Sequence, residues 1–285
     1  MAQDLGGKRA VITGAASGIG RAIAEDLVAR GAQVLMADID TAALHSAAAP
    51  LGPAASVWTC DVADHGQVEA LADQASTVMG GCDMVFANAG LLKSGRFTKF
   101  TPEDVDRILA VNVRGAWSTA AVFARQMIAT GQGGHICFTG SEHALGFQHA
   151  GAAIYTASKH ALLGLAEVLR AEVPDTVKIS ILCPGLTATA LGSAPGAAAS
   201  PRAAQAAALQ AQVQARGMPV AEVARAAIDG ALGGTFYIVT HSHAVRAAQA
   251  RFEEISAAFA DQAPMSRNGD RYEVNRVIAE VAAQT

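Results

Sequence analysis

Short hydrophobic runs recur along the chain and alternate with longer segments in which apolar residues follow a helical period. Each short run is apolar throughout, which is typical of a parallel strand covered by helices on both faces. The expected strands are 8–13, 33–38, 56–61, 83–88, 135–140, 177–183 and 235–240. The segments of helical period include 20–30, 67–79, 103–128 and 220–232. Seven strands with six helical connections predict an α/β fold, a three-layer doubly wound parallel seven-stranded sheet of the Rossmann type.

The segment 103–128 opens with residues that commonly begin a helix. We expect Thr101 to cap it and Pro102 to take the first helical position. Glu103 and Asp104 then place negative charge beside the positive end of the helix dipole.

Two regions depart from the alternation. Residues 186–217 are rich in Ala, Gly, Ser and Pro, which fits either a solvated linker with a weak Ala-rich helix or a mobile lid. A lid would lie over the carboxyl ends of the strands, where ligands of doubly wound sheets bind. Residues 1–240 are expected to form one domain, and 241–285 a C-terminal helical tail. Its candidate anchors are Phe252, Ile255, Phe259 and Val274.

Composition narrows the class of protein. The chain has 285 residues, 51% of them hydrophobic, and a net charge of −4. This balance excludes intrinsic disorder and argues against nucleic-acid binding, since no basic cluster is present to neutralise phosphates. Apolar runs end before the ~18 residues of a membrane span, and Asp4, Lys8 and Arg9 stand where a signal peptide would be apolar. Because none of the four cysteines forms a C-x-x-C pair, we expect buried free thiols in a cytoplasmic protein.

A glycine-rich loop, Thr13-Gly14-Ala15-Ala16-Ser17-Gly18-Ile19-Gly20, joins the first expected strand to the first helix. Glycines at this point permit a tight turn and a close approach of the backbone to a pyrophosphate. The helix that follows directs free N–H groups and its dipole at the phosphates. The loop therefore predicts a dinucleotide site, although a tight strand-to-helix turn alone would also use glycines.

The cofactor expected there is NAD. Asp38 ends the second strand, where a carboxylate can accept hydrogen bonds from the adenosine ribose and repels a 2′-phosphate. Neither the loop nor Ile39 offers a base to hold that phosphate. The other interpretation of Asp38 is a solvated acid at a strand end.

Tyr155 and Lys159 form the main candidate for chemistry. Four residues apart in a helix, their side chains lie on one face. A phenol of pKa ~10 is a poor base at neutral pH, but a nearby ammonium group favours the phenolate. Ser141 follows the fifth strand at the same edge of the sheet and can donate a hydrogen bond to a substrate oxygen.

With these motifs in order, the chain resembles the short-chain dehydrogenase/reductase family over about residues 6–240. The matching elements are T-G-x-x-x-G-x-G at 13–20, Asn88-Ala89-Gly90, Asn112 in V-N-V, Ser141, Y-x-x-x-K at 155–159 and Pro184-Gly185. The resemblance implies that Tyr155 is the general acid/base and that Ser141 positions the carbinol or carbonyl oxygen. It also implies that Lys159 lowers the pKa of Tyr155 and holds the nicotinamide ribose, and that Asn112 holds a water linking Lys159 to solvent.

The same resemblance assigns residues to the cofactor. It places Asp61 and Val62 at the adenine and Leu186 with Thr189 at the carboxamide, with Thr187 as an alternative hydroxyl. The full expected cofactor set is Gly14, Ser17, Gly18, Ile19, Gly20, Asp38, Asp61, Val62, Asn88, Gly90, Tyr155, Lys159, Pro184, Gly185, Leu186, Thr187 and Thr189.

The substrate side is expected to be apolar. Several residues fall on loops at the same edge of the sheet and could line a pocket or simply anchor those loops. With Ser141 and Tyr155, the candidates are Leu91, Leu92, Glu142, His143, Phe147, His149 and Leu191. Glu142, His143 and His149 could equally belong to a solvated loop. His241-x-His243 lacks neighbouring acids in the sequence, so we expect a turn or surface feature there and no metal.

The end of the chain departs from the common family pattern. After the seventh strand it continues into a helical tail, which resembles the secondary-alcohol and aryl-carbinol dehydrogenases of this family. The first hypothesis is therefore an NAD-dependent dehydrogenase of a hydrophobic secondary alcohol. The alternatives are a reductase of acyl-carrier-bound 3-oxoacyl or polyol substrates, the former disfavoured by Asp38, and a non-catalytic NAD-binding regulator. We expect a homodimer or homotetramer, with the long helices 103–128 and 155–173 able to form a dimer.

Overall fold

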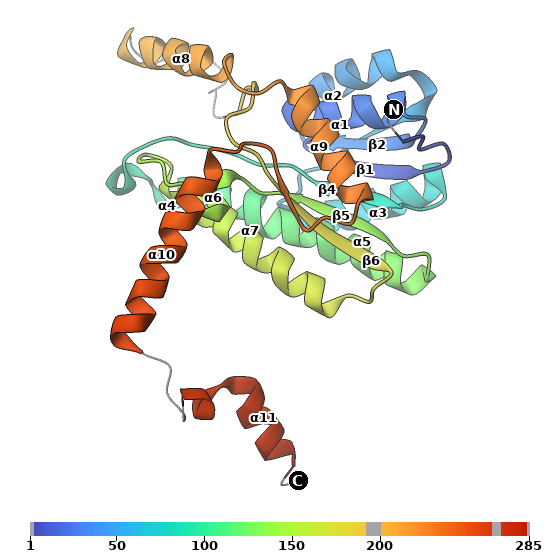
Figure 1. Ribbon diagram of the computed structural model, residues 1–285. Coiled ribbons are helices and arrows are strands. Elements are labelled where there is room, and N and C mark those ends of the chain that lie inside the picture. The colour runs from blue at the N-terminus through green and yellow to red at the C-terminus, as the bar shows by residue number, and fades with distance from the viewer. Residues whose placement is uncertain (1–2, 192–200, 264–268, 284–285) are drawn as a thin grey trace.

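A single parallel sheet forms the centre of the molecule (Figure 1). The computed structural model describes residues 3–191, 201–263 and 269–283. The seven strands lie in the order β3-β2-β1-β4-β5-β6-β7, and every neighbouring pair is parallel. Their bounds are β1 Arg9–Thr13, β2 Gln33–Asp38, β3 Ala55–Thr59, β4 Met84–Ala87, β5 Gly134–Thr139, β6 Val177–Cys183 and β7 Tyr237–Val239. The chain changes direction across the sheet between β1 and β4, and such a switch point opens a crevice at the carboxyl ends of the strands.

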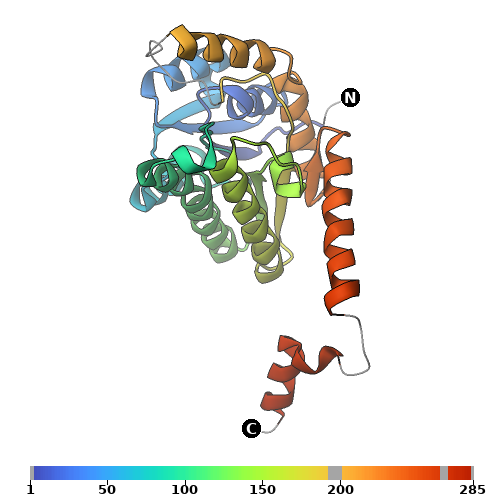
Figure 2. The same ribbon diagram turned by 90° about the vertical axis from the view of Figure 1, so that its left-hand side faces the viewer.

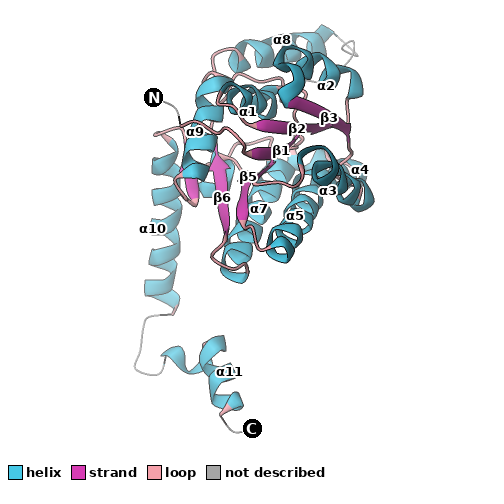
Figure 3. Cartoon of the chain, turned by 90° about the vertical axis from the view of Figure 1, so that its right-hand side faces the viewer, coloured by secondary structure: helices cyan, strands magenta, loops and turns pink. Residues whose placement is uncertain are grey.

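Helices cover both faces of the sheet, and Figure 3 shows the strands enclosed between them. One layer holds α1 (Gly18–Ala29), α2 (Thr41–Ala48) and α9 (Val220–Leu232), and the other holds α3 (His65–Met79), α5 (Ala116–Thr130) and α7 (Ala153–Glu172). Successive residues of a strand enter opposite cores: Val11 packs into one, while Ala10 and Ile12 pack into the other. The fully apolar strands follow from this double coverage. The fold class predicted from the sequence is confirmed.

One long helix predicted by the sequence is interrupted. Segment 103–128 contains α4 (Pro102–Leu109), a π-helical turn η3 (Ala110–Gly115) and α5. The predicted start is confirmed, because the Thr101 hydroxyl accepts from the Asp104 N–H at 3.3 Å and the Asp104 carboxylate accepts from the Thr101 N–H at 3.2 Å. The interruption falls on the V-N-V motif, so it bears directly on the position of Asn112.

The remaining elements lie at the carboxyl edge of the sheet or beyond it. Helix α6 (Glu142–Leu145) follows β5, and α8 (Pro201–Gln214) lies in the Ala-rich segment. Helices α10 (Ala244–Gln262) and α11 (Val274–Ala282) form the tail, and the short 3-10 segments are η1 (Ala49–Ala54), η2 (Phe97–Lys99) and η4 (Gly269–Tyr272). No described helix is both long and apolar enough to cross a membrane. The four cysteines are free as expected, with Cys82 half-buried and the other three buried.

The tail extends away from the body of the molecule (Figures 1 and 2). Its candidate anchors Phe252, Ile255, Phe259 and Val274 have exposed fractions of 70%, 44%, 64% and 64%. The expectation that they anchor the tail to its own chain is therefore wrong. A helical period shows which side chains share a face, but it does not show what covers that face.

Candidate active site

The glycine-rich loop has the shape required to hold a phosphate group. Gly14 has φ +67°, and a Cβ on Gly20 would lie 2.3 Å from the Gly14 carbonyl oxygen. The Ser17 side chain does not cap α1, and no acidic side chain lies in the first turn. The N–H groups of that turn are thus left for an external anion, and they favour negative charge together with the helix dipole. This cradle fits the pyrophosphate of a dinucleotide.

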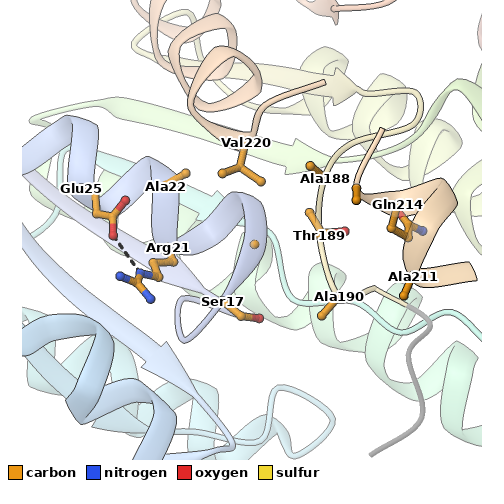
Figure 4. Close-up of a pocket in the computed structure, with 12 residues that line it drawn as sticks. Ser17, Arg21, Ala22, Glu25, Ala188, Thr189, Ala190, Ala211, Gln214 and Val220 are labelled. Carbon is orange, nitrogen blue, oxygen red and sulfur yellow. Dashed lines mark hydrogen bonds and ion pairs between the residues drawn. The ribbon is translucent and has the colours of Figure 1, made fainter. Parts of the chain in front are cut away.

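A cavity of about 580 Å³ lies directly beside this loop (Figure 4). Ser17, Gly18 and Arg21 of the loop and α1 form one wall, and residues 188–190 with the end of α8 form the other. Arg21 was not expected at the site from the sequence, and its guanidinium is paired with Glu25 at 2.7 Å. Part of the 186–217 segment therefore borders the crevice beside the glycine-rich loop, although residues 192–200 lie outside the described residues.

The structure distinguishes the two candidate threonines of this segment. The Thr189 side chain lines the cavity and would lie 3.3 Å from a Cβ placed on Gly18. The Thr187 side chain is buried, and its hydroxyl donates to the Gly185 carbonyl at 3.0 Å. Thr189 is thus the hydroxyl available to a ligand in this crevice.

Asp38 is fixed at the end of β2 by the main chain. One carboxylate oxygen accepts from the Ala16 N–H at 3.0 Å and the other from the Asp40 N–H at 3.1 Å. Each oxygen retains lone pairs for a further donor. Ile39 beside it is 58% exposed and offers no charge to a phosphate. Asp38 is therefore a bound structural acceptor that faces the loop, and not a freely solvated acid.

Asn88 and Asp61 hold neighbouring strand ends in place. The Asn88 amide donates to the Thr13 and Gly14 carbonyl oxygens at 3.1 and 3.3 Å, and its Oδ1 accepts from the Thr139 hydroxyl at 3.1 Å. Asp61 accepts from the Ala63 N–H at 2.9 Å. The Asn88 side chain thus joins β1, β4 and β5, while any contact of these residues with adenosine stays a prediction.

Tyr155 and Ser141 lie together in a buried position at the carboxyl edge of the sheet. Their exposed fractions are 6% and 5%. Burial raises the pKa of Tyr155 to about 12, although a hydrogen bond with Ser141 acts in the opposite direction. The groups of the chain itself therefore raise the pKa of Tyr155, whereas the family resemblance implies a lowered pKa.

Lys159 is buried one helical turn after Tyr155. Burial lowers the pKa of Lys159 to about 8, because the charged ammonium is separated from water. Its Nζ donates to the Thr139 carbonyl at 2.6 Å and lies 5.5 Å from the centre of the Tyr155 ring. Lys159 thus reaches past the tyrosine ring toward the end of β5.

Asn112 occupies the π-helical turn, and its side chain is fully engaged. Its Oδ1 accepts from the Leu91 N–H at 2.7 Å, and its Nδ2 donates to the Leu91 carbonyl at 2.9 Å and to the Ser158 hydroxyl at 3.0 Å. Gly90 borders both polar groups, since a Cβ on it would lie 3.5 Å from Asn112 Oδ1 and 3.7 Å from Lys159 Nζ. Asn112 thus joins the loop after β4 to α7, and its part in a proton relay stays a prediction.

Aromatic rings gather beside Tyr155 on the side expected for substrate. The His143 ring meets the rings of Phe147 and Tyr155 edge to face, with centroid distances of 5.4 and 5.3 Å. The Thr156 hydroxyl lies 2.7 Å from His143 Nδ1, and burial lowers the pKa of His143 to about 4. His143 is therefore a neutral ring. Of the other candidates, Leu91 and Leu92 are half-buried, and His149 and Leu191 are exposed.

Two histidines that follow β7 contact the segments that follow β5 and β6, an arrangement not expected from the sequence. His241 Nδ1 accepts from the Gly185 N–H at 3.0 Å, so its Nε2 donates to the Leu186 carbonyl, also at 3.0 Å. His243 Nε2 lies 2.9 Å from Glu142 Oε2, an ion-pair contact without the alignment of a hydrogen bond. Glu142 is buried, so the solvated-loop interpretation is wrong for it. The only available signal was that both histidines follow β7 at the edge where the site lies.

Within the ranges that the structure describes, no group of three or more His, Cys, Asp or Glu side chains is placed to hold an ion.

Comparison with known proteins gives one consistent family. The family model of the short chain dehydrogenases matches residues 8–198. The chain is 40% identical over 184 residues to 1-deoxy-11-beta-hydroxypentalenate dehydrogenase of Streptomyces exfoliatus, a match covering 62% of this chain and 66% of that protein. The chain thus spans about two thirds of that relative's length.

Solved structures extend the similarity to nearly the whole chain. A short-chain dehydrogenase/reductase from Burkholderia phymatum in complex with NAD is 31% identical, with a TM-score of 0.83 over 93% of this chain and 100% of that one. The apo form of LigO from Sphingobium sp. strain SYK-6 is 28% identical, with a TM-score of 0.77 over 98% of both chains. The second match includes most of the helical tail.

Proposed function

Because the chain belongs to the short-chain dehydrogenase family, we propose that it is an NAD-dependent oxidoreductase that interconverts a hydrophobic, bulky or aromatic secondary alcohol and its ketone. The family and the dehydrogenase among its relatives establish the coarser class, an oxidoreductase acting on alcohol or ketone groups. The observation that carries the finer proposal is the buried group of Ser141, Tyr155 and Lys159 at the crevice of the sheet.

The residues around the crevice fit a dinucleotide, and Asp38 favours NAD. The loop of Gly14, Gly18 and Gly20 would hold the pyrophosphate, and Asp38 would accept hydrogen bonds from the adenosine ribose. A 2′-phosphate at the same place would lie against the Asp38 carboxylate, which is already held by two main-chain N–H groups. Thr189 would meet the carboxamide from the opposite wall of the cavity.

The proposed role of Ser141, Tyr155 and Lys159 is to transfer one proton to or from the substrate oxygen. In the oxidative direction, the Tyr155 phenolate removes the hydroxyl proton of the alcohol while Ser141 holds the same oxygen by a hydrogen bond. In the reductive direction, the neutral Tyr155 phenol donates that proton to the forming alkoxide. A bound nicotinamide cofactor would supply the hydride chemistry of the reaction in both directions. Lys159 holds positive charge near the phenol and would pass the proton toward solvent through Asn112 and water.

The surroundings of Tyr155 favour an apolar substrate. The neutral ring of His143 packs on Tyr155, and Phe147 packs on His143, so neither of these two rings brings a charge to the reacting oxygen. Leu92 and Leu191 would extend the apolar surface toward the 186–217 segment. Such a surface gains from the burial of aliphatic or aromatic area at roughly 25 cal/mol per Å². A small polar alcohol would gain much less.

The proposal is tested by following absorbance at 340 nm with NAD and NADP against aliphatic, cyclic and aryl secondary alcohols. We expect activity with NAD, highest for the bulky apolar alcohols and rising with pH in the oxidative direction, because Tyr155 must lose its proton. Tyr155→Phe should lower turnover by about 100- to 10,000-fold. Its binding of NADH, followed by fluorescence, should be nearly unchanged.

Three results would refute parts of the proposal separately. Near-normal turnover by Tyr155→Phe removes the proton-transfer role, and a preference for NADP removes the Asp38 argument. A preference for small polar alcohols removes the apolar pocket. Absence of turnover with every alcohol, despite tight NADH binding, would point to a regulator.

A further inference from the structure

Helix α10 carries an apolar stripe that the described part of the chain leaves uncovered. Val245, Phe252, Ile255 and Phe259 are spaced by seven, three and four residues, which is the heptad spacing of helices that pair side by side. Their exposed fractions are 53%, 70%, 44% and 64%. Scattered exposed hydrophobic residues are ordinary, but a continuous stripe marks an interaction surface.

Helix α11 repeats the feature. Its apolar residues Val274, Val277, Ile278 and Val281 share one face and are 64%, 40%, 60% and 57% exposed. A helix of 9 residues is too short to be stable alone in water, where roughly 12–15 residues are marginal. Helix α11 therefore needs a packing partner to be stable.

The start of α10 is fixed to the body, so the stripe does not fold back onto its own chain. Gly146 lets α10 approach α6 closely, since a Cβ there would lie 2.7 Å from the Ala247 carbonyl oxygen. The His243–Glu142 contact and a hydrogen bond between Arg251 and His160 hold the same end. After Arg251 every residue of α10 is exposed, and the helix leaves the body in both views (Figures 1 and 2).

We propose that α10 pairs antiparallel with α10 of a second copy of this chain, across a two-fold axis near Phe252. A two-fold axis pairs one surface with itself, and the stripe meets that condition because Val245 and Phe259 lie equally far from Phe252. Of the positions beside the stripe, Gln249, Ser256 and Ala258 carry no charge, and the Arg251 guanidinium is bonded to His160 of its own chain.

The charges of α10 favour the antiparallel arrangement. Arg246 lies in the first turn and Asp261 in the last, so each opposes the dipole of its own helix. In an antiparallel pair, Arg246 lies near the negative carboxyl end of the partner helix and Asp261 near its positive amino end. A parallel pair would place like ends together and leave both charges unfavourable.

A lipid surface is a poorer occupant for the stripe. Helices that lie on anionic membranes carry lysine and arginine along the polar face. The polar face of α10 instead carries Arg246 with Glu253, Glu254 and Asp261, so acidic side chains predominate. The match to LigO over 98% of both chains shows that such a tail recurs as part of a related fold. A second copy of the chain is therefore the occupant that the stripe fits.

The first test measures the mass of the full chain in solution by light scattering after gel filtration. Phe252→Glu with Phe259→Glu places two charges in the stripe and should halve the mass of the assembly. Ala250→Glu with Ala257→Glu adds the same charge to exposed positions on the opposite face of α10 and should leave it unchanged. An unchanged mass for the stripe variant, or a monomeric wild-type chain, overturns the proposal.

The second test does not disturb folding and reports the direction of the pairing. Under mild oxidation Phe252→Cys should give a covalent dimer, because both copies meet at the axis. Val245→Cys alone should not, since its two copies would be about 21 Å apart along the pair at 1.5 Å per residue, beyond the ~7 Å that a disulfide spans. Val245→Cys combined with Phe259→Cys should again cross-link.

The native thiols provide a built-in control for that experiment. Three of the four cysteines are buried and Cys82 is half-buried, so the unmodified chain should remain uncross-linked under the same oxidation. Cross-linking of Val245→Cys as fast as Phe252→Cys would mean a parallel pair and overturn the antiparallel arrangement. Absence of cross-linking in every variant would overturn the pairing itself.

Discussion

At the scale of single residues, burial and charge act against each other around Tyr155. Burial holds the phenol neutral with a pKa of about 12, and it lowers the pKa of Lys159 to about 8. A neutral phenol is ready to donate a proton to a ketone, whereas oxidation of an alcohol requires the phenolate first. The positive charge of oxidised nicotinamide would favour that phenolate. In the proposed reaction, the side chains alone thus keep the phenol protonated, as reduction of a ketone requires. Formation of the phenolate, which oxidation of an alcohol requires, would depend on the charge of the bound cofactor.

Asp38 gives a residue-scale test of cofactor choice. We expect Asp38→Ala to raise the KM for NAD by at least tenfold, because the ribose loses its acceptor, and to lower the KM for NADP, because the repulsion is removed. Steady-state kinetics with both cofactors measures the change. Asp40→Ala is the matched control, since Asp40 caps α2 at the same edge and should change neither KM appreciably. A rise in both KM values for Asp38→Ala would show that Asp38 only holds the glycine-rich loop in its conformation and does not select between the two cofactors.

His135 gives a residue-scale test of stability against pH. It is buried on β5 with Nε2 2.8 Å from the Ser180 hydroxyl, and burial lowers its pKa from 6.5 to about 4. Because the folded pKa is lowered, the unfolded chain binds the proton first, and stability is lost as pH falls from 6.5 toward 4. From pH 7 to pH 5 the loss from His135 is on the order of 2 kcal/mol. Urea unfolding at both pH values should show a smaller loss for His135→Asn than for the wild type.

At the scale of elements, the period of apolar residues predicts strands and helices well where each element buries a face within the chain. The strands 33–38 and 177–183 have the predicted bounds, and α9 does too. The π-helical turn was not predictable in this way, because one added residue in a turn hardly changes the apolar pattern. The hydrogen bond between His241 and Gly185 was missed for a different reason. It joins the ends of β7 and β6, which are far apart in the sequence and become neighbours only when these strands pair in the sheet.

The phosphate loop gives an element-scale prediction with a control in α7. Gly20→Ala would place a Cβ 2.3 Å from the Gly14 carbonyl oxygen, so the loop must move and cofactor affinity should fall by at least tenfold. Gly164→Ala in α7 meets nothing within 4 Å and should stabilise the protein by about 1 kcal/mol, the usual gain of alanine over glycine in a helix. Fluorescence titration with NADH and thermal unfolding distinguish the two. Equal NADH affinity in both variants would contradict the close-packed loop.

At the scale of the whole molecule, two hydrophobic cores enclose one sheet, while the tail lies outside both. The sequence predicts the body almost completely, because its strands and helices each bury a face within the chain. The tail has the same kind of apolar pattern, and so its residues were expected to be anchors. Only the structure shows that this face has no partner within the described part of the chain.

Shortening the chain separates the two roles of the tail. A chain ending at Arg251 keeps His241, His243 and the contacts on Gly146, and it should retain cofactor affinity and the thermal stability of the body. A chain ending at Thr240 loses the bonds to Gly185 and Leu186 and should bind NADH at least tenfold more weakly. NADH titration and calorimetry check both. Full affinity in the shorter chain would show that the histidine contacts do not support the site.

The π-helical turn at Ala110–Gly115 limits how the length of this protein can vary. Its ring contains one residue more than an α-helical ring, so α4 and α5 together form a helix with one residue inserted. Deleting Val113 would allow a continuous α-helix with no loss of main-chain bonding. The orientation of α4 relative to α5 would change little, because the wider turn already absorbs the added residue, but Asn112 lies inside that turn and would move away from Leu91 and Ser158. We therefore expect the loss of one codon at this position to be compatible with folding and to remove the side-chain contacts of Asn112.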